Sequence, residues 1–510
     1  MSRPLRMGVA AAVVAGSVLF SRLLGLVREA LLASLIGVSA EGDLYRQAFT
    51  IADFLNYLLA GAYLSITLIP ILSRHLEQGD ADGANRAFSS AFRFVSLAIA
   101  GLTIVMWAAA DPLVSLMFPQ AVDHDRLVSL TRLVLPAQVF LVVGALLMAV
   151  QYTHRRFVMP ALAPIIYNLG IILGGLASGL FGDTNAEGFL WGAVVGSAVG
   201  NFGLQWFGAR ATGTRLVRVP RGQSSIGEYL LLALPLMLGQ SIAVLDEQFV
   251  RWFGQIEQGA TSALSFARQL NMVPIGVIAQ AAGVAAYPFL ARLAARGDTR
   301  GLTATTSKAA RTTVFVAAAA TAALLVLARP LVRLLYQWGA FTAEDTELVA
   351  RLLMIYALSI PAWGLHQILS RHFYAKRKMW TPVLIGTVGT VIAVPVWSGL
   401  YELSGVEGFA IASVVVISSY AIALLVAWGF DSGWPAVRGV GFSLLRGLTA
   451  AAAATLLALP VVNAVFGREE LTILGGLGAA ALGGITTLAG FLVVAFLFRA
   501  PELKEIRGKA

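Results

Sequence analysis

Three arginines lie deep inside long apolar segments of the sequence, namely Arg22, Arg28 and Arg268. An ionised side chain at such a depth in a membrane costs about 2.5–3.5 kcal/mol on an insertion scale, so each one should face a water-filled cavity or a charged partner. The planar guanidinium fork matches a phosphate well, and the bond is stronger in a low dielectric. The three arginines therefore predict a binding site for an anion, and a diphosphate fits that chemistry.

Acidic residues accompany these arginines. Glu29 follows Arg22 by two helical turns and so shares its helical face, whereas Arg28 is turned about 120° away, so Glu29 balances only part of the charge. In a later segment, Asp246 and Glu247 precede Arg251. The alternative interpretation is a structural network of ion pairs between helices. It fits Glu247 and Arg251 best, because they stand at i and i+4 of one helix.

A polar stripe also crosses the second apolar segment. It consists of Asp53, Asn56, Tyr57 and Gly61, at i, i+3, i+4 and i+8. This spacing places all four on one helical face. The stripe is expected to line the same cavity as the arginines.

The sequence contains no recognisable motif for other kinds of chemistry. The sequence has no cysteine, which removes disulfides, thiolate nucleophiles and cysteine metal sites. It has no HExxH, GxSxG or Walker motif, so hydrolytic and nucleotide-driven functions lack support. The net charge of +10 does not form a basic stripe interleaved with aromatic residues, which argues against nucleic acid. We expect a transporter without a cofactor or a resident metal.

The composition indicates the elements that position these residues. Of 510 residues, 58% are apolar and 13% are charged, and the mean hydropathy is +0.78. Apolar runs of about 20 residues each suit one bilayer crossing. The sequence predicts an all-α polytopic membrane protein with about fourteen transmembrane helices, near residues 8–36, 45–73, 89–110, 127–152, 160–182, 188–209, 228–253, 260–291, 307–328, 347–374, 382–401, 407–429, 441–466 and 472–498.

Lysine and arginine gather in alternate loops. One set of loops contains pairs such as Arg155 and Arg156, whereas the opposite set contains acidic pairs such as Glu469 and Glu470. Basic loops stay in the cytoplasm. The pattern predicts a multi-pass membrane protein with both termini in the cytoplasm.

The sequence also repeats itself at a fixed distance. The segment Pro70-Ile-Leu-Ser-Arg74, followed by Gly79-Asp80, recurs as Pro288-Phe-Leu-Ala-Arg292, followed at the same spacing by Gly297-Asp298. This repeat predicts two parallel six-helix lobes with a substrate site between them, as in alternating-access transporters. The expected domains are 1–215, 216–435 and 436–510, the last containing two additional helices.

The residues carry a family resemblance. Ser21-Arg-Leu-Leu-Gly-Leu-Val-Arg28-Glu, Gly339-Ala-Phe-Thr-Ala-Glu-Asp345 and Leu369-Ser-Arg-His-Phe-Tyr-Ala375 resemble segments of the MurJ (MviN) lipid II flippases. This family belongs to the superfamily of multidrug, oligosaccharidyl-lipid and polysaccharide exporters. The resemblance implies movement of undecaprenyl-diphosphate-linked peptidoglycan precursor from the cytoplasmic to the periplasmic leaflet, with a groove for the polyprenyl tail at the last two helices.

The resemblance also assigns roles. It implies that Arg22 and Arg28 bind the diphosphate, with Arg268 near the position of a further family arginine. Glu29, Asp43, Asp53 and Asp246 would balance charge and support coupling, and Asp246 is a candidate ligand for a sodium ion. The sequence departs from the family pattern at positions that affect the cavity. These are Asn56, Tyr57, Gly61, Gln269 and Lys378.

The sequence thus predicts a lipid II flippase that works by alternating access. Two alternatives stay open at this point, a flippase for another undecaprenyl-diphosphate-linked glycan and a cation-coupled drug exporter of the same fold. A third is an inactive scaffold in a cell-wall complex. The expected partners are the glycolipid substrate, membrane lipids and proteins of cell-wall synthesis, and no nucleic acid.

Overall fold

The computed structural model describes residues 7–58, 61–181, 184–220, 227, 229, 242–278, 285–466 and 473–503. The regular structure in these ranges is helical throughout, without a strand, so the all-α class is confirmed. The chain forms two compact units, Met1–Gln240 and Ser241–Ala510. The three expected domains, with boundaries after residues 215 and 435, stay a prediction.

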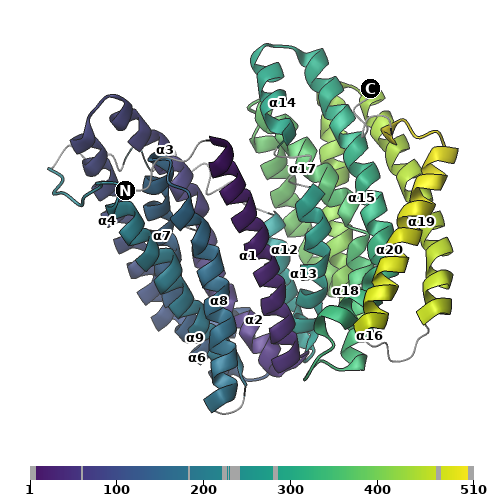
Figure 1. Ribbon diagram of the computed structural model, residues 1–510, viewed down its shortest axis with the longest axis horizontal. Coiled ribbons are helices and arrows are strands. Elements are labelled where there is room, and N and C mark those ends of the chain that lie inside the picture. The colour runs from purple at the N-terminus through teal and green to yellow at the C-terminus, as the bar shows by residue number, and fades with distance from the viewer. Residues whose placement is uncertain are drawn as a thin grey trace. The chain divides into compact units, whose positions relative to one another are not determined.

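The first unit contains ten described α-helices and one π-helical stretch. They are α1 (Met7–Leu35), α2 (Ala40–Leu58), α3 (Gly61–Glu77), α4 (Ala81–Ala108), α5 (Ala110–Met117), α6 (His124–Val134), α7 (Pro136–Thr153), α8 (Val158–Phe181), α9 (Ala186–Gly196), the π-helix η1 (Ser197–Gly203) and α10 (Leu204–Arg210). Within this unit, α4 packs against α7, and α1 packs against α8 (Figure 1).

The second unit contains longer helices. In the part that the structure describes they are α12 (Ile242–Phe253), the 3-10 turn η2 (Gly254–Ile256), α13 (Ala260–Ile278), α14 (Ala285–Ala295), α15 (Thr299–Tyr336), α16 (Ala343–Ala357), α17 (Ile360–Ala375), α18 (Trp380–Ser432), α19 (Trp434–Phe466) and α20 (Ile473–Leu497). In Figure 1, α19 and α20 lie beside α15.

The expected transmembrane segments correspond to helices. Each of the fourteen ranges overlaps at least one described helix, although residues 228 and 230–241 of the seventh range lie outside the described part. In the described part of the chain, seven helical spans are long and apolar enough to cross a membrane, one of them formed by α6 and α7 together. An eighth span results when α16 and α17, bent by 40°, are counted together. Several other spans are divided into shorter helices, which an expectation based on apolar length alone does not predict.

Some of these divisions have a local cause. The 53-residue α18 contains Gly405, whose backbone angles (φ 58°, ψ −139°) interrupt the helix between the two expected ranges 382–401 and 407–429. A positive φ of this kind is readily adopted only by glycine. The glycine at position 405 therefore determines where α18 is interrupted.

The turns of the sequence repeat have the same structure in both units. Gly79 (φ +73°) ends one helix, and the Asp80 carboxylate accepts from the Gly83 amide at 2.7 Å to cap α4. In the second unit, Gly297 (φ +71°) and Asp298 form the same arrangement at the start of α15. The bond from the Gly83 amide lowers the pKa of Asp80, because it stabilises the charged carboxylate. The sequence repeat thus relates two equivalent helix connections.

The last two helices belong to the second unit. Phe315, Ala318 and Ala322 of α15 form a buried cluster with small residues of α19 and with Phe491 of α20. Alanine allows helix axes to approach closely, and this packing holds membrane helices together.

Candidate functional site

Arg28 lies two turns before the end of α1 and is bound from two sides. Its Nη2 donates to Oε1 of Glu29 at 2.7 Å, and its Nη1 donates to Oδ1 of Asn168 on α8 at 3.1 Å. The Asn168 amide is itself oriented, because its Nδ2 donates to the Pro164 carbonyl at 2.9 Å. The Nε of Arg28 is buried and makes no hydrogen bond with the protein. The partly buried guanidinium of Arg28 therefore has one donor, Nε, without an acceptor in the protein.

A second arginine completes this group. Nη2 of Arg46, on α2, donates to Oε2 of Glu29 at 3.0 Å. The two oxygens of Glu29 thus bind one guanidinium each, and the carboxylate side chain is only 4% exposed. A buried carboxylate in this position requires such partners, since an unpaired buried charge is costly. Arg28, Glu29 and Arg46 are named the first-unit cluster below.

The other predicted residues of the first unit differ in their burial and contacts. Arg22 is exposed on α1, nearly two turns before Arg28. Asp43 is buried and Asp53 half-buried, both on α2. Asn56 donates to Oε1 of Gln138 on α7 at 3.0 Å. The side chain of Tyr57 lies outside the described residues, and Gly61 is the first residue of α3.

The second unit contains a similar arrangement around Glu247. Arg251 donates to its Oε1 at 2.6 Å, which confirms the expected pair within the helix. Arg268, on α13, donates to Oε2 of the same carboxylate at 3.4 Å. Glu247, Arg251 and Arg268 are named the second-unit cluster. Arg28 belongs to the first compact unit and Arg268 to the second.

The remaining predicted residues of the second unit are less informative. Gln269 is half-buried on α13. Asp246 lies on α12, and its side chain is outside the described residues, so its suggested role with sodium stays untested. No group of three or more histidine and acidic side chains that could bind a metal occurs in the described part of the chain. Lys378 lies in the turn between α17 and α18 and pairs with Asp431, near the end of α18, at 2.5 Å.

Two contributors to the first-unit cluster were missed by the sequence analysis. Arg46 lies on α2 and Asn168 on α8, and neither is among the residues that the sequence predicts for the site. No local sequence pattern indicates either residue, because each contacts the cluster from a different helix. Glu247 does have one, since the offset that relates Pro70 to Pro288 also relates Glu29 to Glu247. The repeat therefore relates the two carboxylates.

The fold defines a multi-pass all-α membrane protein with ion pairs between its helices. A solved inward-facing multidrug resistance MATE family transporter has the same fold, with a TM-score of 0.65, 15% sequence identity and coverage of 82% of this chain and 95% of that one. At this identity the similarity shows the fold only.

The sequence identifies the family. The model of the lipid II flippase MurJ family matches residues 32–497, and the chain belongs to that family. Its members are named flippases, which are transporters and not enzymes.

Individual relatives match most of the chain. A probable lipid II flippase MurJ of Rhizobium meliloti (strain 1021) is 26% identical, over 97% of this chain and 95% of the relative. The lipid II flippase MurJ of Burkholderia cenocepacia is 27% identical, over 74% of this chain and 75% of the relative. A solved lipid II flippase MurJ in an inward closed conformation has a TM-score of 0.74 at 21% identity and covers 95% of this chain and 98% of that one.

Proposed function

We propose that this protein flips lipid II, the undecaprenyl-diphosphate-linked peptidoglycan precursor, from the cytoplasmic to the periplasmic leaflet of the bacterial inner membrane. Membership of the MurJ family supports this function. The transport is by alternating access and involves no covalent step. The protein must therefore bind the diphosphate within the membrane, from the cytoplasmic side, and release it on the periplasmic side.

The observation that supports the function best is the buried Nε of Arg28, which makes no hydrogen bond with the protein. Its guanidinium carries five donor hydrogens, and the Nε hydrogen has no partner in the protein. A phosphate oxygen accepts strongly from such a donor, and the planar fork allows two parallel bonds. Arg22 supplies a second, exposed cation nearly two turns before it on α1.

Glu29 has a specific part in this proposal. It binds Arg28 and Arg46 while no substrate is present, so neither buried cation is left without a carboxylate. A diphosphate would compete with Glu29 for Arg28, while Arg46 keeps the carboxylate in place. When the diphosphate leaves, the pair between Arg28 and Glu29 forms again. Glu29 thus lowers the cost of the empty state, and Glu247 would do the same for Arg268 in the second unit.

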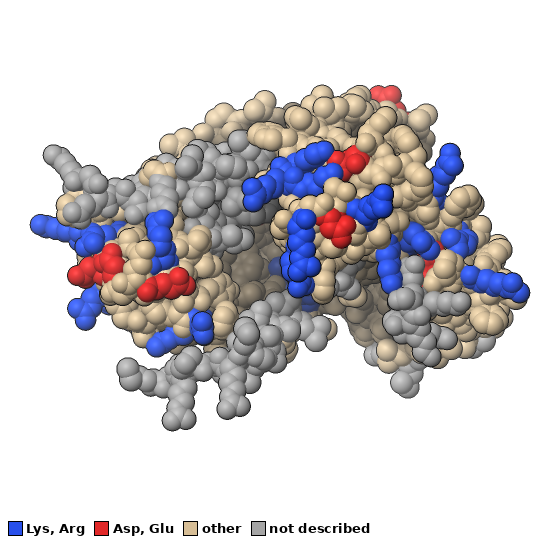
Figure 2. Space-filling view, turned by 90° about the horizontal axis from the view of Figure 1, so that it is seen from above, with Lys and Arg blue, Asp and Glu red and all other residues tan. Residues whose placement is uncertain are grey.

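The orientation forms part of the proposal. Arg74 and Arg86 flank the turn between α3 and α4, and Arg296 lies in the turn between α14 and α15, as expected near cytoplasmic loops. In the second unit, the end at which α14, α15 and α17 meet presents many lysine and arginine side chains (Figure 2). We place both turns, and both termini, on the cytoplasmic side.

The test is complementation of a bacterial strain depleted of its own lipid II flippase. The wild-type chain should restore growth and the exposure of lipid II on the periplasmic leaflet, measured by enzymatic cleavage of the exposed lipid. Arg28→Ala should restore neither while inserting normally. Arg93→Ala is the matched control, because Arg93 is an exposed arginine in the middle of α4, outside the first-unit cluster, and donates to the Val217 carbonyl. Failure of the wild-type chain at normal membrane levels would contradict the function, whereas full activity of Arg28→Ala would contradict only the site.

A further inference from the structure

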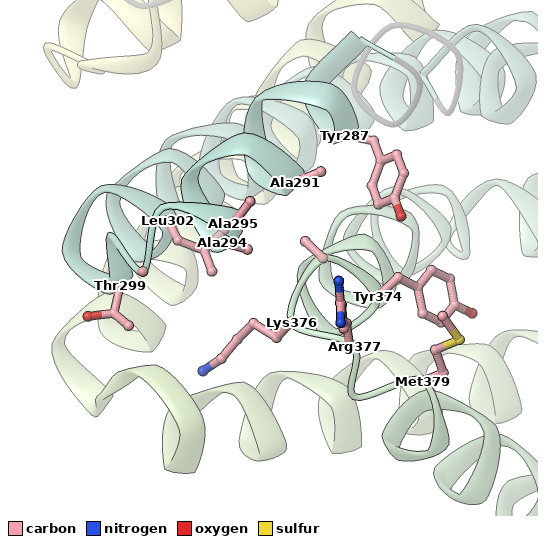
Figure 3. A pocket seen from close by; sticks show the side chains of 12 residues that line it. Tyr287, Ala291, Ala294, Ala295, Thr299, Leu302, Tyr374, Lys376, Arg377 and Met379 are labelled. Atoms are coloured by element: carbon pink, nitrogen blue, oxygen red, sulfur yellow. The ribbon is translucent and has the colours of Figure 1, made fainter.

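A pocket of about 630 Å³ lies inside the second unit, apart from the second-unit cluster. Its walls come from α14, from the turn that begins α15, and from the end of α17 with the turn that follows it. All these residues belong to one compact unit. In Figure 3, Tyr287 points from α14 toward the space between that helix and the turn after α17, and Lys376 extends toward Thr299.

The polar groups of this pocket are mostly cationic. Lys376 and Arg377 line it directly, and Arg377 is exposed. Arg371, before them on α17, interacts electrostatically with Tyr287 and Tyr374, which also line the pocket. The phenol groups and the Thr299 hydroxyl supply neutral donors.

Two carboxylates must be weighed against these cations. Asp431 binds Lys376 at 2.6 Å and Lys378 at 2.5 Å, and Nε2 of His372 lies 3.1 Å from the same carboxylate. The ammonium of Lys376 has three donor hydrogens and directs one of them to Asp431, so it has donor capacity for another acceptor. Asp298 is occupied with the Gly301 amide as the cap of α15. The positive charge around the pocket is therefore only partly balanced.

The backbone presents Arg377 in an unusual way. Its φ of 58° lies in the left-handed region, which non-glycine residues seldom adopt. The turn is closed by the Arg377 amide, which donates to the Tyr374 carbonyl at 3.0 Å, and by the Lys378 amide, which donates to the Phe373 carbonyl at 2.9 Å. This closed turn fixes the direction in which Lys376 and Arg377 leave the chain.

We propose that this pocket binds a phosphorylated ligand, whose phosphate group is held by Lys376 and Arg377 beside the start of α15. The ligand's phosphate has two possible sources with the same chemistry, a soluble phosphorylated compound and the head group of an anionic phospholipid. Basic pockets between membrane helices at the cytoplasmic side are suited to either. The volume is large enough for a small ligand and lies in the usual range for such sites. The site is separate from Arg28 and from the flipping function proposed above.

The test uses the absence of cysteine from the full-length chain. Ala295→Cys places a single thiol on the wall of the pocket, and its rate of reaction with a maleimide is measured in nanodiscs of phosphatidylcholine. Inorganic pyrophosphate should slow the reaction about tenfold at ten times its Kd, because the unoccupied fraction of sites falls by the factor 1 + [L]/Kd. Sodium chloride at matched ionic strength should not slow it. Nanodiscs with phosphatidylglycerol give the lipid arm, in which slow reaction without pyrophosphate identifies the head group as the source.

Three variants carrying the same thiol complete the experiment. Arg377→Gln should lose the protection, and it keeps a side chain of similar length in an exposed turn. Arg296→Gln removes an equal charge from the exposed turn before α15 and should retain the protection. Arg28→Gln should also retain it. Absence of protection by both pyrophosphate and anionic lipid, protection that persists in Arg377→Gln, or protection that is lost in Arg28→Gln would each overturn the proposal.

Discussion

Glu29 and Glu247 occupy equivalent positions of the internal repeat, and each binds two arginines. In both cases one arginine lies on the same helix as the glutamate and the other lies on the next α-helix of that unit. The arginines themselves are not at equivalent positions, since Arg28 precedes its glutamate whereas Arg251 follows its own by one helical turn. The carboxylate is thus the feature that the two units share.

The two glutamates should differ in their contribution to stability. Glu29→Gln removes a carboxylate that is 4% exposed from between two cations, and loss of one partner of a buried pair costs about 3 kcal/mol or more. Glu247 is 39% exposed, and solvent screening reduces the cost of Glu247→Gln. We expect a clearly larger fall in the melting temperature of the purified protein for Glu29→Gln. Equal falls would show that burial does not set the strength of these pairs.

Arg28→Lys should separate charge from geometry. Lysine restores the positive charge but presents a point charge in place of the planar fork. We expect flipping roughly tenfold slower than in the wild type, because the parallel bonds to a phosphate are lost. The measurement is the initial rate of lipid exposure in proteoliposomes, with Arg28→Ala as the inactive reference. A rate for Arg28→Lys equal to the wild type would mean that charge alone is sufficient.

Single cysteines should report the topology. Gln78 and Arg296 are exposed residues at equivalent repeat positions, and neither caps a helix as Asp80 and Asp298 do. Gln78→Cys and Arg296→Cys should both be shielded from an impermeant thiol reagent added to the periplasmic side, whereas the exposed Val122→Cys should react. Labelling after permeabilisation is the control for reactivity. Labelling of only one of the equivalent pair would contradict the parallel repeat.

Energy coupling should follow the membrane potential. Moving one charge through the membrane corresponds to about 2.3 kcal/mol per 100 mV, and an inside-negative potential draws an empty cationic carrier toward the cytoplasm. A bound diphosphate cancels that charge, so the potential acts mainly on the return step. We expect transport in proteoliposomes to depend on potential when sodium is equal on both sides. Transport that follows a sodium gradient at zero potential would refute this expectation and favour a role for Asp246.

The C-terminal segment should depend on one carboxylate. Glu502 is fully buried, accepts from the Ser443 hydroxyl, and lies 3.5 Å from Arg311 and from Arg446. Glu502→Ala removes the shared partner of these groups, which connects the end of the chain to α15 and α19. We expect a lower melting temperature and faster proteolysis near the C-terminus, with Glu344→Ala on the α16 surface as the control. Unchanged proteolysis would show that helix packing alone anchors α20.

The sequence determined the features that depend on neighbouring residues. Apolar length predicted where the helices lie, glycine and aspartate defined the turns of the repeat, and Gly405 accounts for the break in α18. The depth of Arg28 in an apolar segment indicated that it needs a partner. These are local properties, because composition over about 20 residues and helical geometry decide them.

The tertiary structure alone decided which partners meet. Arg28 and Asn168 are 140 residues apart, and Arg46 and Glu29 are separated by a helix connection. Helical spacing shows which residues share a face, but it does not show which face of another helix lies opposite. The pocket beside Arg377 likewise exists only because α14, α15 and α17 converge at one end of the second unit. Contacts of this kind are set by packing between distant segments, and no pattern within a single segment contains that information.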